Sequence, residues 1–214
     1  MTSHNPYNPL DKLNLAESIA EAVLAKPLSP LPPEKSFEGA GIYVLYYSGD
    51  FPAYRPIAQA NASEKFGYPI YVGKAIPKGG RSGGGVLSPH PTGHDLYSRL
   101  VNHSKSIKQT TNLKLEDFRC RYLVVDDIWI SLGERLLIEK YHPLWNSVIP
   151  GFGNNDPGGG RYAQKRSAWD GLHPGRAWAV KVKADSRTID QLTASIEAHL
   201  KLTNKSHDPK REKT

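Results

Sequence analysis

Two stretches decide the fold: GIYVLYY, residues 41–47, and PIYVG, residues 69–73. β-Branched and aromatic residues dominate both, which is typical of strands. A polar segment with prolines separates them, so the second strand can return beside the first and pair with it antiparallel. A third strand is predicted at FRCRYLVV, residues 118–125. The sequence therefore predicts a small, mainly antiparallel three-stranded sheet.

Helical patterns lie between and around these strands. Apolar residues at i, i+4 and i+7 spacing predict a helix over 95–107 and another over 128–141, with Asp127 as the N-cap of the second. Asn14 begins a capping box with Glu17, which predicts the start of an N-terminal helix. The other predicted elements are a short strand over 178–183 and a final helix over 188–200. The fold class is α/β, of the α+β type.

The composition is that of an ordered globular protein, because 38% of the 214 residues are hydrophobic and 23% are charged. The single cysteine, Cys120, excludes an internal disulfide framework and is expected to be a core thiol. No apolar run approaches the roughly 18 residues of a membrane span, and the N-terminus lacks the apolar core of a signal peptide. We therefore expect a cytoplasmic protein without a membrane partner.

Positive charge is concentrated in two loop-rich regions. The chain carries 28 Lys and Arg against 21 Asp and Glu, a net charge of +7. Residues 74–108 and residues 161–183 each hold six basic residues against one acidic residue. Clustered Lys and Arg favour a polyphosphate partner, because binding releases counterions. A general solubility surface is the alternative.

Glu134 lies where a leucine would be expected. It sits in the middle of an apolar stripe, with Ile130 one turn before it and Leu137 one turn after it. A bare buried carboxylate would cost several kcal/mol, so this one must be protonated, paired or bound to a metal. Glu139, beside Arg135, points to a different face and needs no such explanation.

The order of motifs resembles the GIY-YIG nuclease superfamily. GIY at 41–43 and YVG at 71–73 are followed by a helix with Arg99 and His103 at i, i+4, and then by Glu134 with Asn146 twelve residues later. YVG departs from the second name-giving tripeptide at its middle residue. The resemblance covers roughly residues 41–146. Either tripeptide alone is weak, but the ordered set is specific.

The resemblance implies a role for each residue. Glu134 would hold a single divalent cation per active site, Mg²⁺, against the scissile phosphate. One of Tyr43 and Tyr71, with Tyr43 preferred, would orient or deprotonate the attacking water. Arg99 would grip phosphate oxygens, and a half-buried His103 would hydrogen-bond a catalytic tyrosine or the water. Asn146 would support the site. The alternatives are core aromatic residues, a satisfied core histidine and a buried Glu–Arg pair.

Among the superfamily's members, the chain resembles the type II restriction endonucleases that cut CCGCGG. This implies a homodimer that cleaves double-stranded DNA at a short palindrome, with no nucleotide cofactor, since a phosphate-binding Gly-x4-Gly-Lys-Ser/Thr loop is absent from the sequence. The alternatives are a structure-specific repair nuclease, a homing-type nuclease and a non-catalytic DNA-binding protein. The candidate DNA-contacting residues are Lys74, Lys78, Arg81, Arg161, Lys165, Arg166 and Arg176.

Three parts are expected along the chain. Residues 1–38 would form an N-terminal helical arm and linker. Residues 39–150 would form the catalytic core, with insertions at 48–67 and 75–94. Residues 151–214 would form a DNA-contacting extension with a helix and a basic tail.

Overall fold

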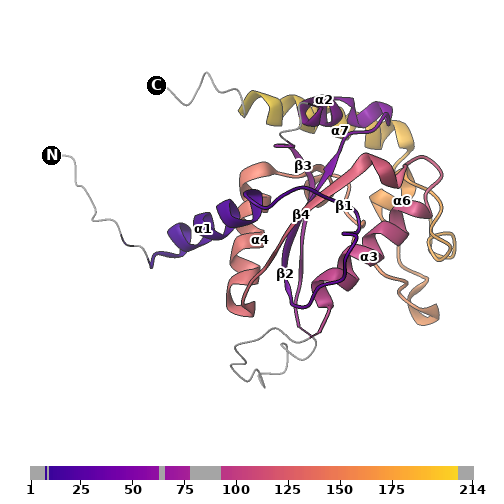
Figure 1. Ribbon diagram of the computed structural model, residues 1–214. Coiled ribbons are helices and arrows are strands. Elements are labelled where there is room, and N and C mark those ends of the chain that lie inside the picture. Colours follow the sequence, from indigo (N-terminus) through magenta and orange to yellow (C-terminus); the bar gives the residue numbers. More distant parts are fainter. Residues whose placement is uncertain (1–7, 9, 63–65, 78–92, 207–214) are drawn as a thin grey trace.

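The structure, a computed structural model, describes residues 8, 10–62, 66–77 and 93–206. Within these residues one antiparallel sheet has the strand order β1-β4-β2-β3 (Figure 1). The strands are β1 (Ser29–Pro30), β2 (Gly41–Tyr47), β3 (Pro69–Ala75) and β4 (Phe118–Val124). The three predicted strands and their antiparallel pairing are confirmed. The sheet has a fourth strand because Ser29 and Pro30, in the expected N-terminal linker, pair with β4.

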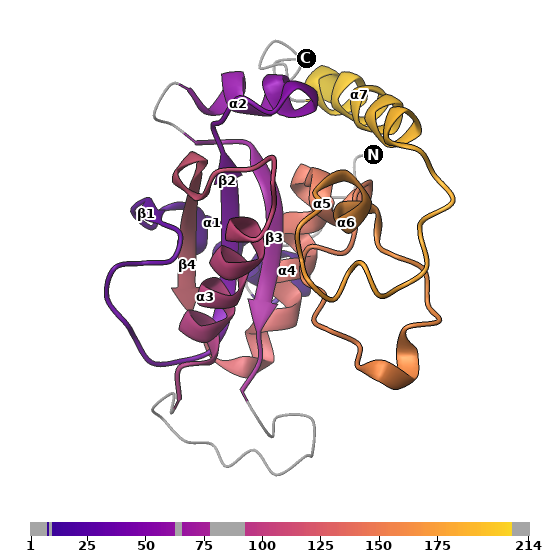
Figure 2. The same cartoon turned by 90° about the vertical axis from the view of Figure 1, so that its right-hand side faces the viewer.

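Helices cover both faces of the sheet. Helices α1 (Lys12–Leu24) and α4 (Asp127–Tyr141) lie on one face, and α3 (Asp95–Lys108) lies on the other (Figures 1 and 2). The remaining helices are α2 (Arg55–Asn61), α5 (Leu144–Ser147), α6 (Ala168–Leu172) and α7 (Ile189–Ser206), with short 3-10 turns η1 (Pro52–Tyr54), η2 (Leu115–Asp117) and η3 (Gly159–Arg161). The α+β class is therefore confirmed.

Strand β2 is the centre of the protein. All seven of its residues are buried, because its sequence is apolar on both faces. Ile42 and Val44 pack in the layer under α1 and α4, whereas Tyr43 and Leu45 pack in the layer under α3. The second layer also contains Ile196 of α7, so one hydrophobic cluster joins residues from before and after position 150.

Close packing on the α4 side depends on Gly133. A Cβ at this position would lie 2.6 Å from side-chain atoms of both Ile19 and Ile42. Without one, α4 can approach α1 and the sheet closely. Glu134 follows directly in sequence, so this contact sets the distance of its backbone from the sheet.

Both predicted N-caps are wrong, by three residues for α1 and by one residue for α4. Helix α1 begins after Asp11, whose side chain accepts a hydrogen bond from the Leu13 amide, and Asn14 lies inside the helix. Helix α4 begins after Asp126, which accepts from the Ile128 amide, and Asp127 stands in the first turn. Aspartate caps as well as asparagine does, so neighbouring candidates are hard to separate by sequence.

The expected insertion at residues 48–67 contains η1 and α2. One other local prediction differs from the structure. Residues 178–183 form turns rather than a strand, and Lys183 makes only an isolated bridge to Lys165. The Trp178 ring lies over the Arg176 guanidinium at 4.7 Å, and this contact is made across a turn. The final helix is confirmed as α7. Cys120 is a core thiol as predicted, with its pKa raised by burial to about 12.

Candidate active site

The site begins with a buried pair between the sheet and α3. Tyr43 on β2 is 0% exposed and His103 on α3 is 2% exposed. The Tyr43 hydroxyl lies 2.5 Å from Nε2 of His103. The predicted hydrogen bond to a tyrosine is thus present, but His103 is fully buried rather than half-buried. The reason is Phe152, whose ring stacks on the imidazole at 4.4 Å with 17° between the planes.

Burial holds both members of this pair in their neutral forms. Desolvation raises the pKa of Tyr43 well above its usual value, and the nearby Tyr71 adds to the rise. Arg99 acts in the opposite direction and lowers this pKa. Desolvation and then the positive charges of Arg99 and Arg176 lower the pKa of His103 well below its usual value. At neutral pH the phenol therefore keeps its proton and donates it to an imidazole nitrogen that is free to accept.

The second tyrosine lies beside the first. Tyr71 on β3 has its ring centroid 6.1 Å from that of Tyr43. Strand pairing sets Tyr43 opposite Gly73, and a Cβ on Gly73 would collide with the Tyr43 hydroxyl and ring. The last glycine of the YVG tripeptide is therefore required by the close approach of the phenol.

Arg99 reaches the two tyrosines from α3, one turn before His103. Its Nη2 donates to the Gly153 carbonyl at 3.0 Å. Its Nε is buried and has no hydrogen-bond partner in the described part of the chain. A buried guanidinium N–H without a protein acceptor is rare, and a bound water or ligand can supply the acceptor. An anionic oxygen suits it best.

Glu134 faces the same site from α4. Its side chain is 16% exposed, and Oε2 lies 2.7 Å from Nζ of Lys74. Burial chiefly raises the pKa of the Tyr71 phenol, and the negative charge of Glu134 adds to the rise. The carboxylate is therefore paired, one of the three states that the helical pattern allowed, and its partner is a lysine rather than the arginine of the alternative interpretation. Lys74 also donates to the Ser131 hydroxyl at 3.1 Å. Glu139 is exposed, as predicted.

The donor set fits a lightly held hard cation. In the described part of the chain, no three His, Cys, Asp or Glu side chains gather as metal ligands. Among the described residues assigned to the site, Glu134 is the one that has a carboxylate. Mg²⁺ accepts one carboxylate because it keeps several of its waters, whereas a structural zinc site needs about four protein ligands. The Lys74 ammonium shows that a positive charge is already accommodated beside this carboxylate.

Asn146 supports β3 from outside the sheet. Its Oδ1 accepts from the Val72 amide at 2.9 Å, and its Nδ2 donates to the Val72 carbonyl at 2.8 Å. The amide thus replaces a neighbouring strand at the residue between Tyr71 and Gly73. This geometry agrees with the supporting role expected for Asn146.

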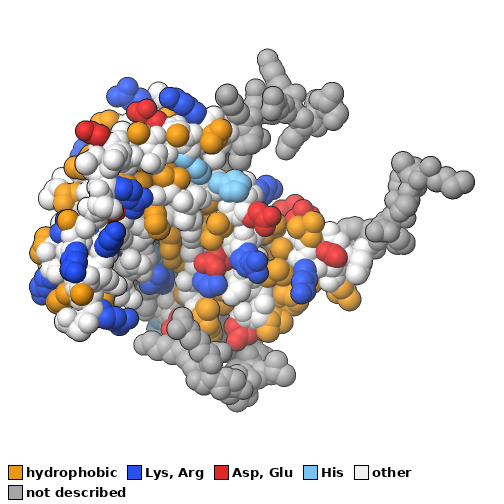
Figure 3. Space-filling model, turned by 180° about the vertical axis from the view of Figure 1, so that it is seen from behind, with side chains coloured by type: hydrophobic (Ala, Val, Ile, Leu, Met, Phe, Trp, Pro, Cys, Tyr) orange, Lys and Arg blue, Asp and Glu red, His pale blue; other side chains and the backbone are white. Residues whose placement is uncertain are grey.

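The basic residues predicted to touch DNA fall into different places. Arg161 and Lys165 are exposed, and Arg166 is half-buried and donates to the Ala179 carbonyl. Figure 3 shows Lys and Arg side chains gathered on the side of the molecule that residues 150–185 form. Lys78 and Arg81 lie outside the described residues.

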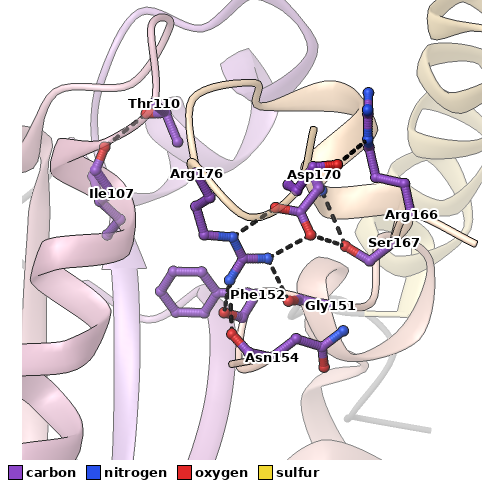
Figure 4. Close-up of polar contacts among 10 residues, drawn as sticks. Ile107, Thr110, Gly151, Phe152, Asn154, Arg166, Ser167, Asp170 and Arg176 are labelled. Carbon is purple, nitrogen blue, oxygen red and sulfur yellow. Dashed lines mark hydrogen bonds and ion pairs between the residues drawn. The ribbon is translucent and has the colours of Figure 1, made fainter. Parts of the chain in front are cut away.

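The predicted DNA-contacting role of Arg176 is wrong. It is 2% exposed and forms an ion pair with Asp170 at 2.6 Å (Figure 4). Such a side chain belongs to the interior and not to a DNA-contacting surface. Its sequence neighbourhood, rich in Gly, Trp and Lys, resembled a nucleic-acid-binding loop, and no local signal distinguishes a buried arginine from an exposed one.

The fold and this constellation define a nuclease of the GIY-YIG class. A family model described as the Eco29kI GIY-YIG domain matches residues 35–200. The chain belongs to this family of restriction endonucleases, whose partner is DNA. A comparison with curated proteins finds no match. GIY-YIG nucleases generally depend on a divalent metal. None of the described helices is long and apolar enough to cross a membrane.

Sequence reasoning missed two residues of the site. Phe152 stacks on His103, and the Gly153 carbonyl accepts from Arg99. The only available signal was the glycine-rich stretch from residue 151 onward, which predicted a turn and nothing about its contacts. The matched family span includes this stretch, whereas the motif resemblance ended near residue 146.

Proposed function

We propose that the protein is a Mg²⁺-dependent type II restriction endonuclease that hydrolyses both strands of a short, palindromic, GC-rich DNA site. The candidate site is CCGCGG, the sequence recognised by the restriction enzyme Eco29kI that names the family. The Nε of Arg99, which has no acceptor among the described residues and lies buried beside Tyr43, Tyr71 and Glu134, carries the proposal. It supplies a donor for a phosphate oxygen where a water-activating group and a cation-binding carboxylate also meet.

Proton transfer from the attacking water follows from the Tyr43–His103 geometry. An isolated phenolate at Tyr43 is disfavoured, since burial raises the pKa of this phenol. The Tyr43 oxygen can take the water proton only as its own hydroxyl proton passes to Nε2 of His103, 2.5 Å away. Burial and Arg99 oppose the resulting imidazolium by lowering the His103 pKa. The negative charge of a phosphate bound at Arg99 would counter that opposition.

Arg99 and Glu134 then hold the phosphate and its counterion. The planar fork of Arg99 stabilises the negative charge that grows on the phosphate oxygens. Glu134 would bind the cation, and Lys74, 2.7 Å away, holds that carboxylate in position. When bound, a divalent cation polarises the phosphate and stabilises the departing oxygen.

We assign DNA binding to the exposed basic residues and to the loop that carries Lys78 and Arg81. Arg161 and Lys165 project into solvent and can reach phosphates, and Arg166 lies beside them. Lys78 and Arg81 stay candidates for base or phosphate contacts, and Lys74 for a phosphate near the cut. One active site cuts one strand, so a palindrome requires two copies related by two-fold symmetry. We therefore propose a homodimer.

Cleavage of linear duplexes tests the function. A duplex with one CCGCGG site should give two discrete fragments with Mg²⁺ and none with EDTA, whereas a duplex with that site scrambled should stay intact. Discrete cutting at another recurring short palindrome would change only the assigned site. Cutting confined to branched or damaged DNA would establish a structure-specific nuclease instead. Binding without cleavage under every divalent metal would leave a non-catalytic DNA-binding protein.

A further inference from the structure

A four-residue stretch, 151–154, forms one wall of the active site. The Phe152 ring stacks on His103 at 4.4 Å and meets Tyr71 edge-on at 5.1 Å. The Gly153 carbonyl accepts from Nη2 of Arg99 at 3.0 Å. A Cβ on Gly153 would lie 2.9 Å from both Arg99 Nη2 and the Tyr71 hydroxyl. The backbone path of this stretch therefore sets the orientation of Arg99 and confines His103.

The same stretch is held from behind by Arg176. Its Nη2 donates to the Gly151 carbonyl at 2.9 Å, and its Nη1 donates to the carbonyls of Phe152 at 3.0 Å and Asn154 at 2.9 Å (Figure 4). The four consecutive carbonyls of residues 151–154 are thus divided between two arginines. Three bind Arg176, and the remaining one, that of Gly153, binds Arg99.

Every N–H of the Arg176 guanidinium is used. Beyond the three carbonyls, Nε and Nη2 donate to the two carboxylate oxygens of Asp170, each at 2.6 Å. This accounts for all five donors of an arginine side chain. The rings of Trp169 and Trp178 lie over the guanidinium at 4.6 and 4.7 Å. A lysine has only three donors and no planar fork, so it cannot reproduce this arrangement.

We propose that Arg176 is a positioning residue for the cleavage reaction: by holding residues 151–154 from behind, it orients the Arg99 guanidinium and seats His103 against Tyr43. The inference rests on the proposed nuclease function. Arg176 touches neither the DNA nor the reacting atoms. Its removal therefore alters the rate of bond cleavage more than the affinity for DNA.

The test compares cleavage rate with binding affinity. In Arg176→Lys, the single-turnover rate constant with Mg²⁺ should fall about 10-fold to 100-fold, because small misplacements of reacting groups have effects of this size. The dissociation constant for the same duplex, measured in EDTA, should stay within about threefold of wild type, as expected for a residue outside the DNA contacts. Gly153→Ala should have the same two effects through its clash with Arg99. The double variant should lose less than the product of the two single losses, since both act on one contact.

Controls separate positioning from loss of fold. Arg187→Met removes the ion pair between the exposed Arg187 and Asp185, and should leave both measurements unchanged. Ile196→Ala makes a cavity in the core around α7 and should lower the melting temperature without changing the rate at a temperature where the protein is folded. If Arg176→Lys does not fold, Gly153→Ala and Phe152→Leu decide the matter.

Two results would overturn the inference. One is wild-type cleavage by folded Arg176→Lys, or by Gly153→Ala and Phe152→Leu where Arg176→Lys does not fold. The other is a loss of DNA binding equal to the loss of rate, which would give the stretch a general structural role. Failure of the proposed function is distinguishable, because Tyr43→Phe and Glu134→Gln would then leave any cleavage unaffected as well.

Discussion

Replacing Tyr43 by phenylalanine removes one oxygen from the centre of the site, and Tyr54 offers a matched control. Both tyrosines are buried and both hydrogen-bond a buried histidine. The Tyr43 hydroxyl meets His103 at 2.5 Å, and the Tyr54 hydroxyl meets His173 at 2.6 Å. The same substitution can therefore be made in two similar environments, only one of which faces Arg99.

Tyr54→Phe should lose more stability, whereas Tyr43→Phe should lose more activity. Tyr43→Phe leaves one buried histidine nitrogen unpaired, at a cost of about 1–3 kcal/mol. Tyr54→Phe leaves two polar atoms unpaired, because the Tyr54 hydroxyl also accepts from Trp145 Nε1 at 2.9 Å, so its cost is larger. Losing the group that accepts the water proton should lower the cleavage rate about 10²–10⁴-fold, which raises the barrier by roughly 3–5 kcal/mol.

Single-turnover cleavage and thermal unfolding measure these effects. Tyr54→Phe should melt at the lower temperature yet cut at nearly the wild-type rate, whereas Tyr43→Phe should melt closer to wild type and hardly cut. A chain of this length shifts its melting temperature by about 2–4 °C per kcal/mol. Cleavage by Tyr43→Phe within about threefold of wild type, well short of the loss expected for a proton acceptor, would refute the proton-transfer reasoning.

Glu134→Gln should abolish Mg²⁺-dependent cleavage, while duplex binding in a gel-shift assay persists. Glu139→Gln, an exposed change on the same helix, should affect neither measurement. Full activity of Glu134→Gln would remove the assignment of Glu134 as the cation ligand. Burial lowers the pKa of His173 to about 3 in the folded protein. In the unfolded chain the same imidazole has a pKa of about 6.5, so below that pH the unfolded chain binds a proton that the folded protein does not. Stability is therefore full above that pH and falls by about 1.4 kcal/mol per pH unit below it, and denaturant titrations should show a shallower fall for His173→Gln. Asn146→Ala unpairs two backbone groups of β3, the amide and the carbonyl of Val72. It should lower the free energy of unfolding by about 1–3 kcal/mol in the same titrations.

Strands and helices were predicted correctly where a local sequence pattern specified them. Strands β2, β3 and β4 are short runs of β-branched and aromatic residues, and helices α3 and α4 repeat apolar residues at helical spacing. The exceptional position of Glu134 was visible for the same reason, since a carboxylate interrupts a stripe that is otherwise apolar. The strand predicted over residues 178–183 was wrong because their tryptophan and valines lie in turns.

The site was predictable as a set of residues but not as a set of contacts. Tyr43, Tyr71, Arg99, His103 and Glu134 were all named from motif order, and the fold brings them together. The partner of Glu134 was not predicted, because Lys74 lies sixty residues away in sequence and joins it only across the β3–α4 contact. The depth of His103 depends on Phe152, which comes from a turn with no regular pattern. The division of the chain near residue 150 stays a prediction.

The sequence by itself determined which segments become most of the strands and helices, and that one carboxylate in the apolar stripe of α4 had to be protonated, paired or bound to a metal. Those properties depend on residues within a turn or two of each other. Only the tertiary structure decided that Lys74 supplies the counter-charge and that Arg176 lies inside while Arg161 lies outside. An arginine has the same charge and donors in either place. Its role depends on which carbonyls and carboxylates the folded chain brings within about 3 Å of it.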